Sequence, residues 1–374
     1  MTYTPQPPWQ NIPTDYTLSG TGDFIASIPG LLGYFPQESA IVVTLELDEH
    51  VGAACIGQVL RTDVGDAEQV AAMASMAPAG PALAHLGLVV SRIPDSMLVR
   101  DAVKALYTAT DIRGKAVVDA CWHVSEIAAG TPYCLLFGPA ASEIAQAGLS
   151  RDLLSGTVSS IITQPTMEPL IAQGALPELD KDDTRSFFDC FKPGEGRATH
   201  PEATRARRRG KRLVQQLAVT PDTVRAEVSR ACAVLVQAPE LPFVGSGKWA
   251  RPAEVVGNAV DLETVVAVLS QPLLRDCLFQ TAICNPRSAA SVLLAIARSF
   301  DGEIRANALS LWGVIAVRLR LTSWAQAAID AAQEAMPEHS LSDILHQLLR
   351  MGAHEKILDS ALAGCDEVWG DLAV

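Results

Sequence analysis

The chain lacks the motifs that mark the common catalytic and metal-binding sites. It contains no CxxC pair, no HExxH, no GxSxG and no glycine-rich dinucleotide fingerprint. Its eight cysteines lie mostly in apolar stretches, which is typical of reduced, buried thiols rather than disulfides or zinc ligands. We therefore predict no metal and no cofactor. Enzymatic activity stays open, because catalytic groups can converge from distant positions, but the sequence favours its absence.

Long hydrophobic runs are also missing, although 49% of the residues are hydrophobic and a large core is available. No apolar run reaches the length of a membrane-spanning helix. Residues 1–18 are rich in proline and lack the basic and apolar regions of a signal peptide, so they are interpreted as a flexible arm. The sequence predicts a cytoplasmic protein with no membrane association. A net charge of −13 makes nucleic acid a disfavoured partner.

Residues 19–140 show alternating strand and helix patterns. A helix is expected from Asp23, kinked or split at Pro29-Gly30, and residues 41–47 and 51–59 predict a hairpin. Further strands are predicted at 86–91, 116–122 and 133–137, with helices at 66–76 and 95–109. These patterns favour an α/β (α+β) sandwich domain with a mixed sheet. Residues 141–200, where the pattern weakens, are predicted to be connecting helices and loops.

Residues 201–374 carry helix signals only and predict an all-α C-terminal domain. Pro201, Pro221 and Pro252 lie at expected first turns, where the missing N–H of proline costs nothing. The stretch from Ala306 to Pro337 matches the tetratricopeptide spacing of small, aromatic and proline residues and predicts a tetratricopeptide-like helix pair. One pair cannot form the concave groove of a repeat array, so a purely structural role is equally compatible.

Two segments carry a family resemblance. Residues 23–43 contain a helix, the turn Leu31-Leu-Gly-Tyr34, a proline, the pair Glu38-Ser39 and a hydrophobic strand. Together with the stretch from Trp312-Gly313 to Leu341, they resemble the actinobacterial family called domain of unknown function 4192, over most of residues 19–362. This chain has only a short segment, from Trp122 to Pro132, where members often carry a longer tryptophan-rich hairpin. The resemblance implies a fold and no established activity.

The turn after the strand at 86–91 is a candidate ligand site. Ligands of α/β sheets gather at the carboxyl ends of strands, and the first turn of a helix offers free N–H groups to anions. Ser91, Arg92, Asp95 and Ser96 are the candidate ligand-binding residues. The alternative, which the sequence favours, is an ordinary helix start with Asp95 as the N-cap.

A second candidate is the basic segment around residue 208. On one helix face, Arg205, Arg208, Arg209 and Arg212 form a patch for an anion or a nucleic acid. The alternative is a solvated helix paired with the acidic residues at 178–183, and the acidity of the whole chain favours it.

Two functional hypotheses follow. The first is a non-catalytic adaptor or regulatory protein that binds a protein partner, with Trp312 and Trp324 as candidate partner-binding residues. The second is an enzyme that binds a small molecule or nucleotide through the N-terminal domain. A deep polar pocket beside residues 91–96 would favour the enzyme. An exposed apolar groove at the tryptophans would favour the adaptor. Nucleic-acid binding through residues 205–212 is a weaker third hypothesis.

Overall fold

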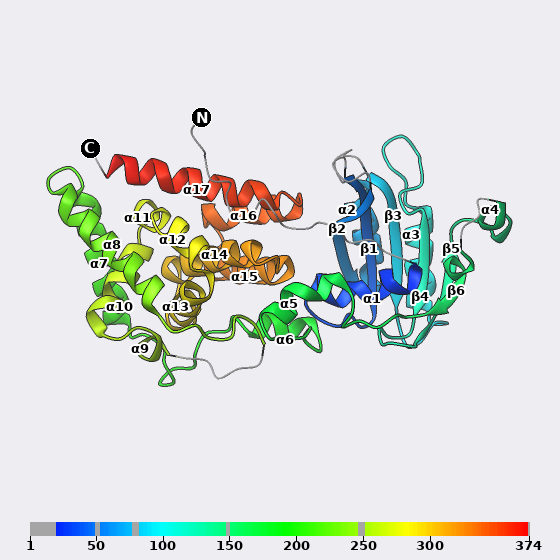
Figure 1. Ribbon diagram of the computed structural model, residues 1–374, viewed down its shortest axis with the longest axis horizontal. Helices are drawn as coiled ribbons and strands as arrows, with labels where there is room; N and C mark the ends of the chain where they lie inside the picture. The colour runs from blue at the N-terminus through cyan, green and yellow to red at the C-terminus, as the bar shows by residue number, and fades with distance from the viewer. Residues whose placement is uncertain (1–19, 49–52, 77–81, 147–149, 246–250, 373–374) are drawn as a thin grey trace, which may run out of the picture. The chain divides into compact units, whose positions relative to one another are not determined.

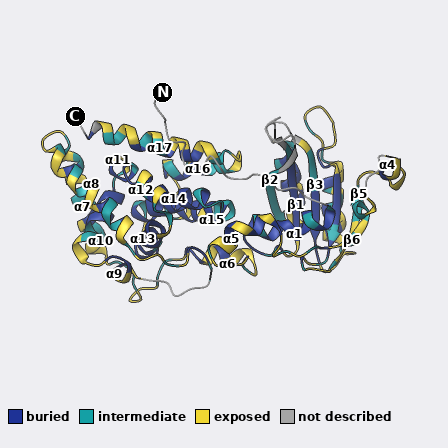
Figure 2. Cartoon of the chain, viewed as in Figure 1, coloured by how far each residue is buried: buried dark blue, intermediate teal, exposed yellow. Residues whose placement is uncertain are grey.

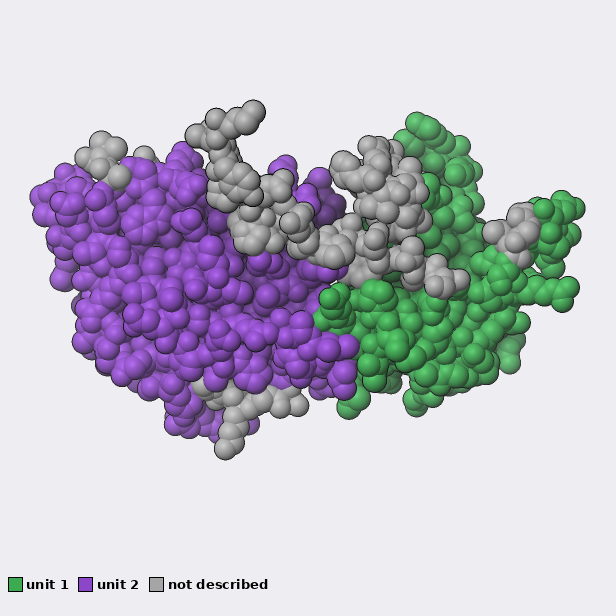
Figure 3. Space-filling model, viewed as in Figure 1, with its two compact units in different colours: residues 1–168, 179–181 green, residues 169–178, 182–374 purple. Residues whose placement is uncertain are grey.

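The computed structural model describes residues 20–48, 53–76, 82–146, 150–245 and 251–372. The predicted arm at 1–18 lies outside these residues. The chain forms two compact units (Figure 3): residues 1–168 with 179–181, and residues 169–178 with 182–374. We call them the sheet unit and the helical unit.

The sheet unit contains a mixed six-stranded sheet with strand order β2-β1-β3-β4-β5-β6 (Figure 1). Only β3 and β4 pair in parallel; the other neighbours are antiparallel. Its strands are β1 (Ser39–Asp48), β2 (Ala53–Asp63), β3 (Ala82–Val90), β4 (Ala120–Val124), β5 (Pro132–Phe137) and β6 (Ser155–Thr157). Its helices are α1 (Thr21–Leu32), α2 (Ala67–Ser75), α3 (Met97–Thr108) and α4 (Ala141–Gln146). The expected mixed sheet is therefore confirmed.

Consecutive side chains of β1 point to opposite faces of the sheet, so its continuous apolar run contributes to a core on each face. Ile41 and Val43 pack with α1, whereas Ala40 and Val42 pack with α2 and α3. The helix α1 continues through Pro29 instead of splitting there, and it ends at Gly33, whose φ of 77° is left-handed. Gly30 is needed for close packing, since a Cβ there would lie 2.6 Å from the Thr166 carbonyl oxygen.

The helical unit follows, and no strand occurs after β6 in the described chain. Its longer helices are α7 (His200–Gln216), α8 (Pro221–Gln237), α10 (Ala259–Leu269), α13 (Pro286–Ser299), α14 (Glu303–Arg318), α15 (Thr322–Ala335), α16 (Ser340–Arg350) and α17 (His354–Asp371). Shorter ones are α6 (Lys181–Ser186), α9 (Pro252–Val255), α11 (Pro272–Asp276) and α12 (Phe279–Cys284), while α5 (Glu168–Ala172) begins at the boundary between the units. The helix-rich C-terminal region is confirmed.

The helix α14 forms the centre of the helical unit. Figure 2 shows it buried along most of its length, and all its residues from Ile304 to Val317 are buried. It packs against α13 and α15. At the contact with α15, a Cβ on Gly313 would lie 3.0 Å from the Ile329 side chain, so the small residue allows the two helices to approach closely.

Candidate functional site

The carboxyl ends of β3 and β4 meet at one edge of the sheet because these strands are parallel. Ser91 follows β3 there, and its backbone N–H donates a hydrogen bond to the Val124 carbonyl at 3.0 Å. Glu38, which precedes β1, lies at the same edge and has a positive φ of 39°. A side chain in this left-handed region is uncommon, so the surrounding contacts must hold it there. This edge is where the sequence places the ligand-binding candidates.

The Glu38 carboxylate organises the turn after β3. The Ser91 hydroxyl donates to Oε2 at 2.7 Å, and the Arg92 backbone N–H donates to Oε1 at 2.9 Å. The same hydroxyl accepts from the Ile93 N–H at 3.2 Å. Ser91 is completely buried. Its hydroxyl is therefore occupied by internal bonds and has no solvent-accessible surface to present to a ligand.

Two further polar side chains complete this edge. His123 Nε2 lies 2.9 Å from the Ser91 carbonyl, and this nitrogen must carry the proton because a carbonyl only accepts. The Arg92 side chain forms an exposed ion pair with Glu126 at 2.8 Å. Sequence reasoning missed Glu38, His123 and Glu126 as members of the site. The pair Glu38-Ser39 in the family resemblance was the one signal that marked this edge.

Beside this turn, Arg61 stabilises the start of β1. Its Nε donates to the Ser39 hydroxyl at 2.9 Å, and its guanidinium pairs with Asp63 at 2.6 Å. Burial raises the pKa of the nearby Tyr34 phenol above its usual value, although the positive charge of Arg61 opposes that rise. Because Arg61 pairs with Asp63, its positive charge is already neutralised within the protein.

The helix α3 begins at Met97, two residues after the predicted start at residue 95, and its N-cap lies one residue later than expected. Ser96, not Asp95, is the N-cap, and its hydroxyl accepts from the Val99 N–H at 3.2 Å. The polar side chains of the turn are thus largely used within the protein, while Asp95 is exposed. Three large apolar side chains of the same turn are uncovered, with exposures of 64% for Ile93, 71% for Met97 and 60% for Leu98. We call these three residues the β3–α3 corner.

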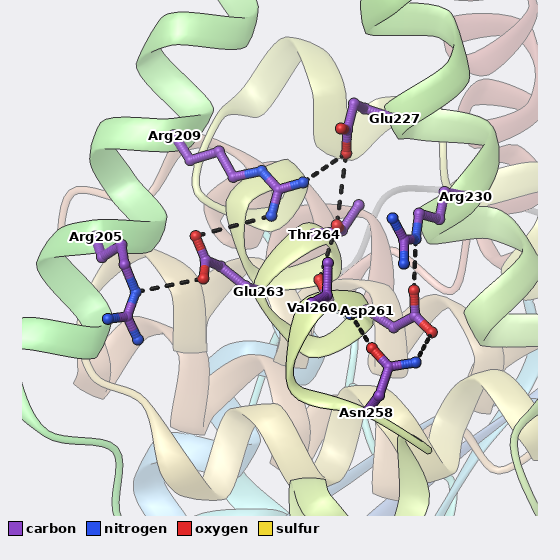
Figure 4. A network of polar contacts seen from close by, with 9 residues as sticks. All are labelled: Arg205, Arg209, Glu227, Arg230, Asn258, Val260, Asp261, Glu263 and Thr264. Atoms are coloured by element: carbon purple, nitrogen blue, oxygen red, sulfur yellow. Dashed lines mark hydrogen bonds and ion pairs between the residues drawn. The ribbon is translucent and has the colours of Figure 1, made fainter.

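The second candidate lies on α7 in the helical unit, and the structure divides its four arginines into two pairs. Figure 4 shows Arg205 and Arg209 pointing toward α10 and α8. Arg209 pairs with Glu227 at 2.7 Å, and Arg205 pairs with Glu263 at 3.3 Å. Arg208 and Arg212 are exposed. The acids that neutralise the first pair come from α8 and α10, rather than from the predicted segment 178–183.

The same network holds the start of α10. Arg230 pairs with Asp261, and the Asn258 side chain accepts from the Asp261 N–H at 2.9 Å as the N-cap (Figure 4). The hydrogen bond from Arg230, followed by the one from Asn258, lowers the pKa of the Asp261 carboxyl, whereas desolvation opposes the shift. These contacts join α7, α8 and α10 through their side chains, which is a structural role.

The third candidate pair, Trp312 and Trp324, lies inside the helical unit. Both side chains are completely buried. Trp312 stacks on Phe243 with a centroid distance of 4.4 Å, and Trp324 contacts Phe187 edge to face at 5.0 Å. Neither indole N–H has a hydrogen-bond partner among the described residues. These two side chains pack the core of the helical unit and have no exposed surface, so the predicted contact with a partner would require this core to open.

The comparisons with known proteins point to one family. The family described as Domain of unknown function (DUF4192) matches residues 22–356. The chain belongs to this family. No curated protein and no solved structure matches it. Membership in DUF4192 therefore brings no activity with it, and any function must be argued from the geometry.

Among the described residues, no group of three or more histidine, cysteine, aspartate or glutamate side chains is arranged to hold a metal ion. None of the described helices combines the length and apolar character needed to cross a membrane.

Proposed function

We propose that this chain is a non-catalytic binding protein, and that the β3–α3 corner docks into an apolar depression on a protein partner. The observation that carries the proposal is the contrast within one turn. Its polar groups bond to one another, as in the contacts of Glu38 with Ser91 and Arg92, while its three large apolar side chains remain uncovered. A polar small molecule needs the opposite arrangement.

The exposed apolar surface is large enough to matter in binding. Burying the uncovered parts of Ile93, Met97 and Leu98 would contribute about 4 kcal/mol, before the entropic cost of association. The exposed Arg92–Glu126 pair adjoins them and would supply the polar rim that protein interfaces have. A ligand-binding or catalytic role for Ser91 and Ser96 has less support, because their hydroxyls already make internal bonds.

We also interpret α14 and α15 as a tetratricopeptide-like pair that closes the helical core, supported by the Gly313–Ile329 approach and by the burial of Trp312. A cytoplasmic location is part of the proposal. It is supported by seven cysteines that are free thiols: Cys121, Cys134, Cys190, Cys232, Cys277, Cys284 and Cys365.

Site-specific photo-crosslinking tests the proposed docking surface. A photoreactive residue at Leu98 is expected to capture one discrete protein in cells that carry the gene. The same residue at Ile112, which is 99% exposed and outside the corner, serves as the control. The captured protein, once purified, should bind Met97→Asp about tenfold more weakly than the unaltered chain and Ile112→Asp equally well. Equal capture at both positions, or equal affinity of both variants, would show that the corner is not the docking surface.

A further inference from the structure

Three cations on the solvent-facing side of α7 have no anionic partner in the part of the chain that the structure describes. Arg208, Lys211 and Arg212 are all exposed, and none forms an ion pair with a described residue. Their spacing of three and four residues places them on one side of the helix. We call these three residues the α7 cationic face.

The neighbouring arginines of α7 show that this lack of partners is selective. Arg209 lies between Glu227 and Glu263, and Arg205 also contacts Glu263. Arg207 donates a hydrogen bond to the Asp301 carbonyl at 3.3 Å. The acid of α7 itself, Glu202, bonds to Thr199 in a capping box at the helix start. Among the described residues, the cations of α7 that face other helices are thus paired, and those of the α7 cationic face are not.

The α7 cationic face is presented by a firmly held helix. Ala206, Gly210 and Leu213 are buried against the rest of the helical unit. A Cβ on Gly210 would lie 2.5 Å from the Ala267 carbonyl oxygen of α10, so the two backbones approach very closely. The backbone that carries the three cations is therefore already ordered. Only their side chains lose conformational entropy when a ligand binds.

We propose that the α7 cationic face binds an acidic segment of a protein partner. Arg208 to Arg212 span about 6 Å along the helix, which matches a few carboxylates on a short peptide. A nucleic-acid duplex carries about one negative charge per 1.7 Å of its axis and would extend past this length. Its remaining phosphates would then face a chain with a net charge of −13. This proposal does not depend on the β3–α3 corner, which lies in the other unit.

Fluorescence anisotropy with a labelled oligoglutamate peptide tests the proposal. The double variant Arg208→Glu, Arg212→Glu is expected to bind the peptide about tenfold more weakly than the unaltered chain. The matched control is Arg100→Glu, Lys104→Glu, which makes the same charge change at the same spacing on the exposed side of α3, and it should leave the affinity unchanged. The affinity of the unaltered chain should fall as salt rises.

A milder variant guards against loss of folding. Arg208→Gln with Arg212→Gln removes the charges without adding repulsion and should give a smaller loss in the same direction, with an unchanged circular dichroism spectrum. Equal weakening in the α3 control would overturn the proposal, because the whole-chain charge would then be responsible. So would equal binding of an oligoglutamine peptide. Tighter binding of a short DNA duplex than of oligoglutamate would assign the face to nucleic acid instead.

Discussion

The two units treat buried polar groups in opposite ways. The sheet unit keeps charge at its rim, and its described buried polar residues are serines, threonines and one glutamine. The helical unit buries the arginines 275, 298 and 305 together with Asn307 and His339. A sheet pairs its backbone groups between strands, whereas helix ends leave carbonyl groups that need donors. The difference shows that buried arginine side chains can stabilise a helical core by donating hydrogen bonds to the free backbone carbonyl groups at helix ends.

Arg305 is the clearest case. It is 9% exposed, and its guanidinium donates to the carbonyls of Ala297, at 2.5 Å, and Phe188, at 2.7 Å. Arg298 similarly donates to the Asp189 carbonyl at 3.0 Å and lies over the Phe191 ring. Burial lowers the pKa of Arg298 to about 10, which leaves it charged at neutral pH. These arginines fasten the segment before α7 to the helices α13 and α14.

Breaking one of these contacts should have the largest effect on stability. Arg305→Ala leaves two buried carbonyls without donors and opens a cavity, so we expect a loss of about 4 kcal/mol in the unfolding free energy of the helical unit. Arg305→Met retains much of the volume and should lose about half as much. Denaturant unfolding followed by hydrogen exchange of α14 measures both. A loss below about 1 kcal/mol for the alanine variant would show that water replaces the arginine.

The next effect is a pH dependence confined to the helical unit. His339 is the N-cap of α16: Nδ1 accepts from the Ser342 N–H at 3.3 Å, and Nε2 donates to Asn307 Oδ1 at 2.8 Å. Burial, and then the nearby Arg275, lower its pKa to about 4 from the usual 6.5, although Asp343 opposes the shift. The unfolded chain therefore binds the proton more readily. Stability is complete above pH 6.5 and is lost as the pH falls toward 4.

We expect acidification from neutral pH to about 4.5 to remove up to about 2.5 kcal/mol through this histidine. His339→Asn supplies an N-cap that does not titrate, so its stability should lack this part of the pH dependence. Hydrogen exchange of α16 in both proteins, at the two pH values, isolates the contribution because the other groups cancel. If the asparagine variant loses as much stability as the unaltered chain, His339 is not the titrating group.

A smaller effect is expected at the rim of the sheet. Ser91→Ala removes the hydroxyl that joins Glu38 to the turn, but water can reach the exposed carboxylate, so the loss should be about 1 kcal/mol. Glu38→Gln keeps one acceptor oxygen and should lose no more than that. Thermal unfolding of the sheet unit, followed by Trp122 fluorescence in a chain where the other tryptophans are replaced by phenylalanine, gives the comparison. A loss as large as that of Arg305→Ala would remove the distinction between the two units.

The smallest expected effect is a difference in unfolding free energy between variants of the adjacent residues Arg208 and Arg209. Arg209→Gln breaks the half-buried contacts with Glu227 and Glu263 and should lower the unfolding free energy by about 1 kcal/mol. Arg208→Gln should change it by less than about 0.3 kcal/mol, because that side chain has no described ionic partner. Urea unfolding of both variants is sufficient. Equal losses would contradict the division of the α7 arginines.

The fold could be predicted where the residues of one short segment determine its secondary structure. The β-branched runs on either side of Asp48 predicted the hairpin of β1 and β2, and the prolines marked helix starts in the helical unit. The strand β6, with only three residues, carries too little pattern to be recognised. The strand predicted at 116–122 begins at Ala120 instead. In the helical unit, Pro252 begins only the short helix α9, which ends at Val255, and α10 begins at Ala259.

The candidate sites were harder to predict because they depend on partners distant in the sequence. Helical spacing predicted that Arg205 and Arg208 share a face. Only the packing of α10 shows that Glu263 pairs with Arg205 and not with Arg208. Likewise, Trp312 was a reasonable surface candidate until Phe243 and Phe188 were seen to enclose it. Arg275, Asn307 and His339 are widely separated along the chain, so their buried contacts left no sequence signature.

The missing side chain at Gly210 has a consequence for how α7 is oriented. An alanine there would place its methyl carbon 2.5 Å from the Ala267 oxygen and 2.3 Å from the Ser270 hydroxyl, closer than atoms can approach. The helix would have to lift or rotate, and the directions of Arg208 and Arg212 would turn with it. The absence of a side chain at Gly210 therefore determines the direction in which Arg208 and Arg212 point, although Gly210 contacts neither of them.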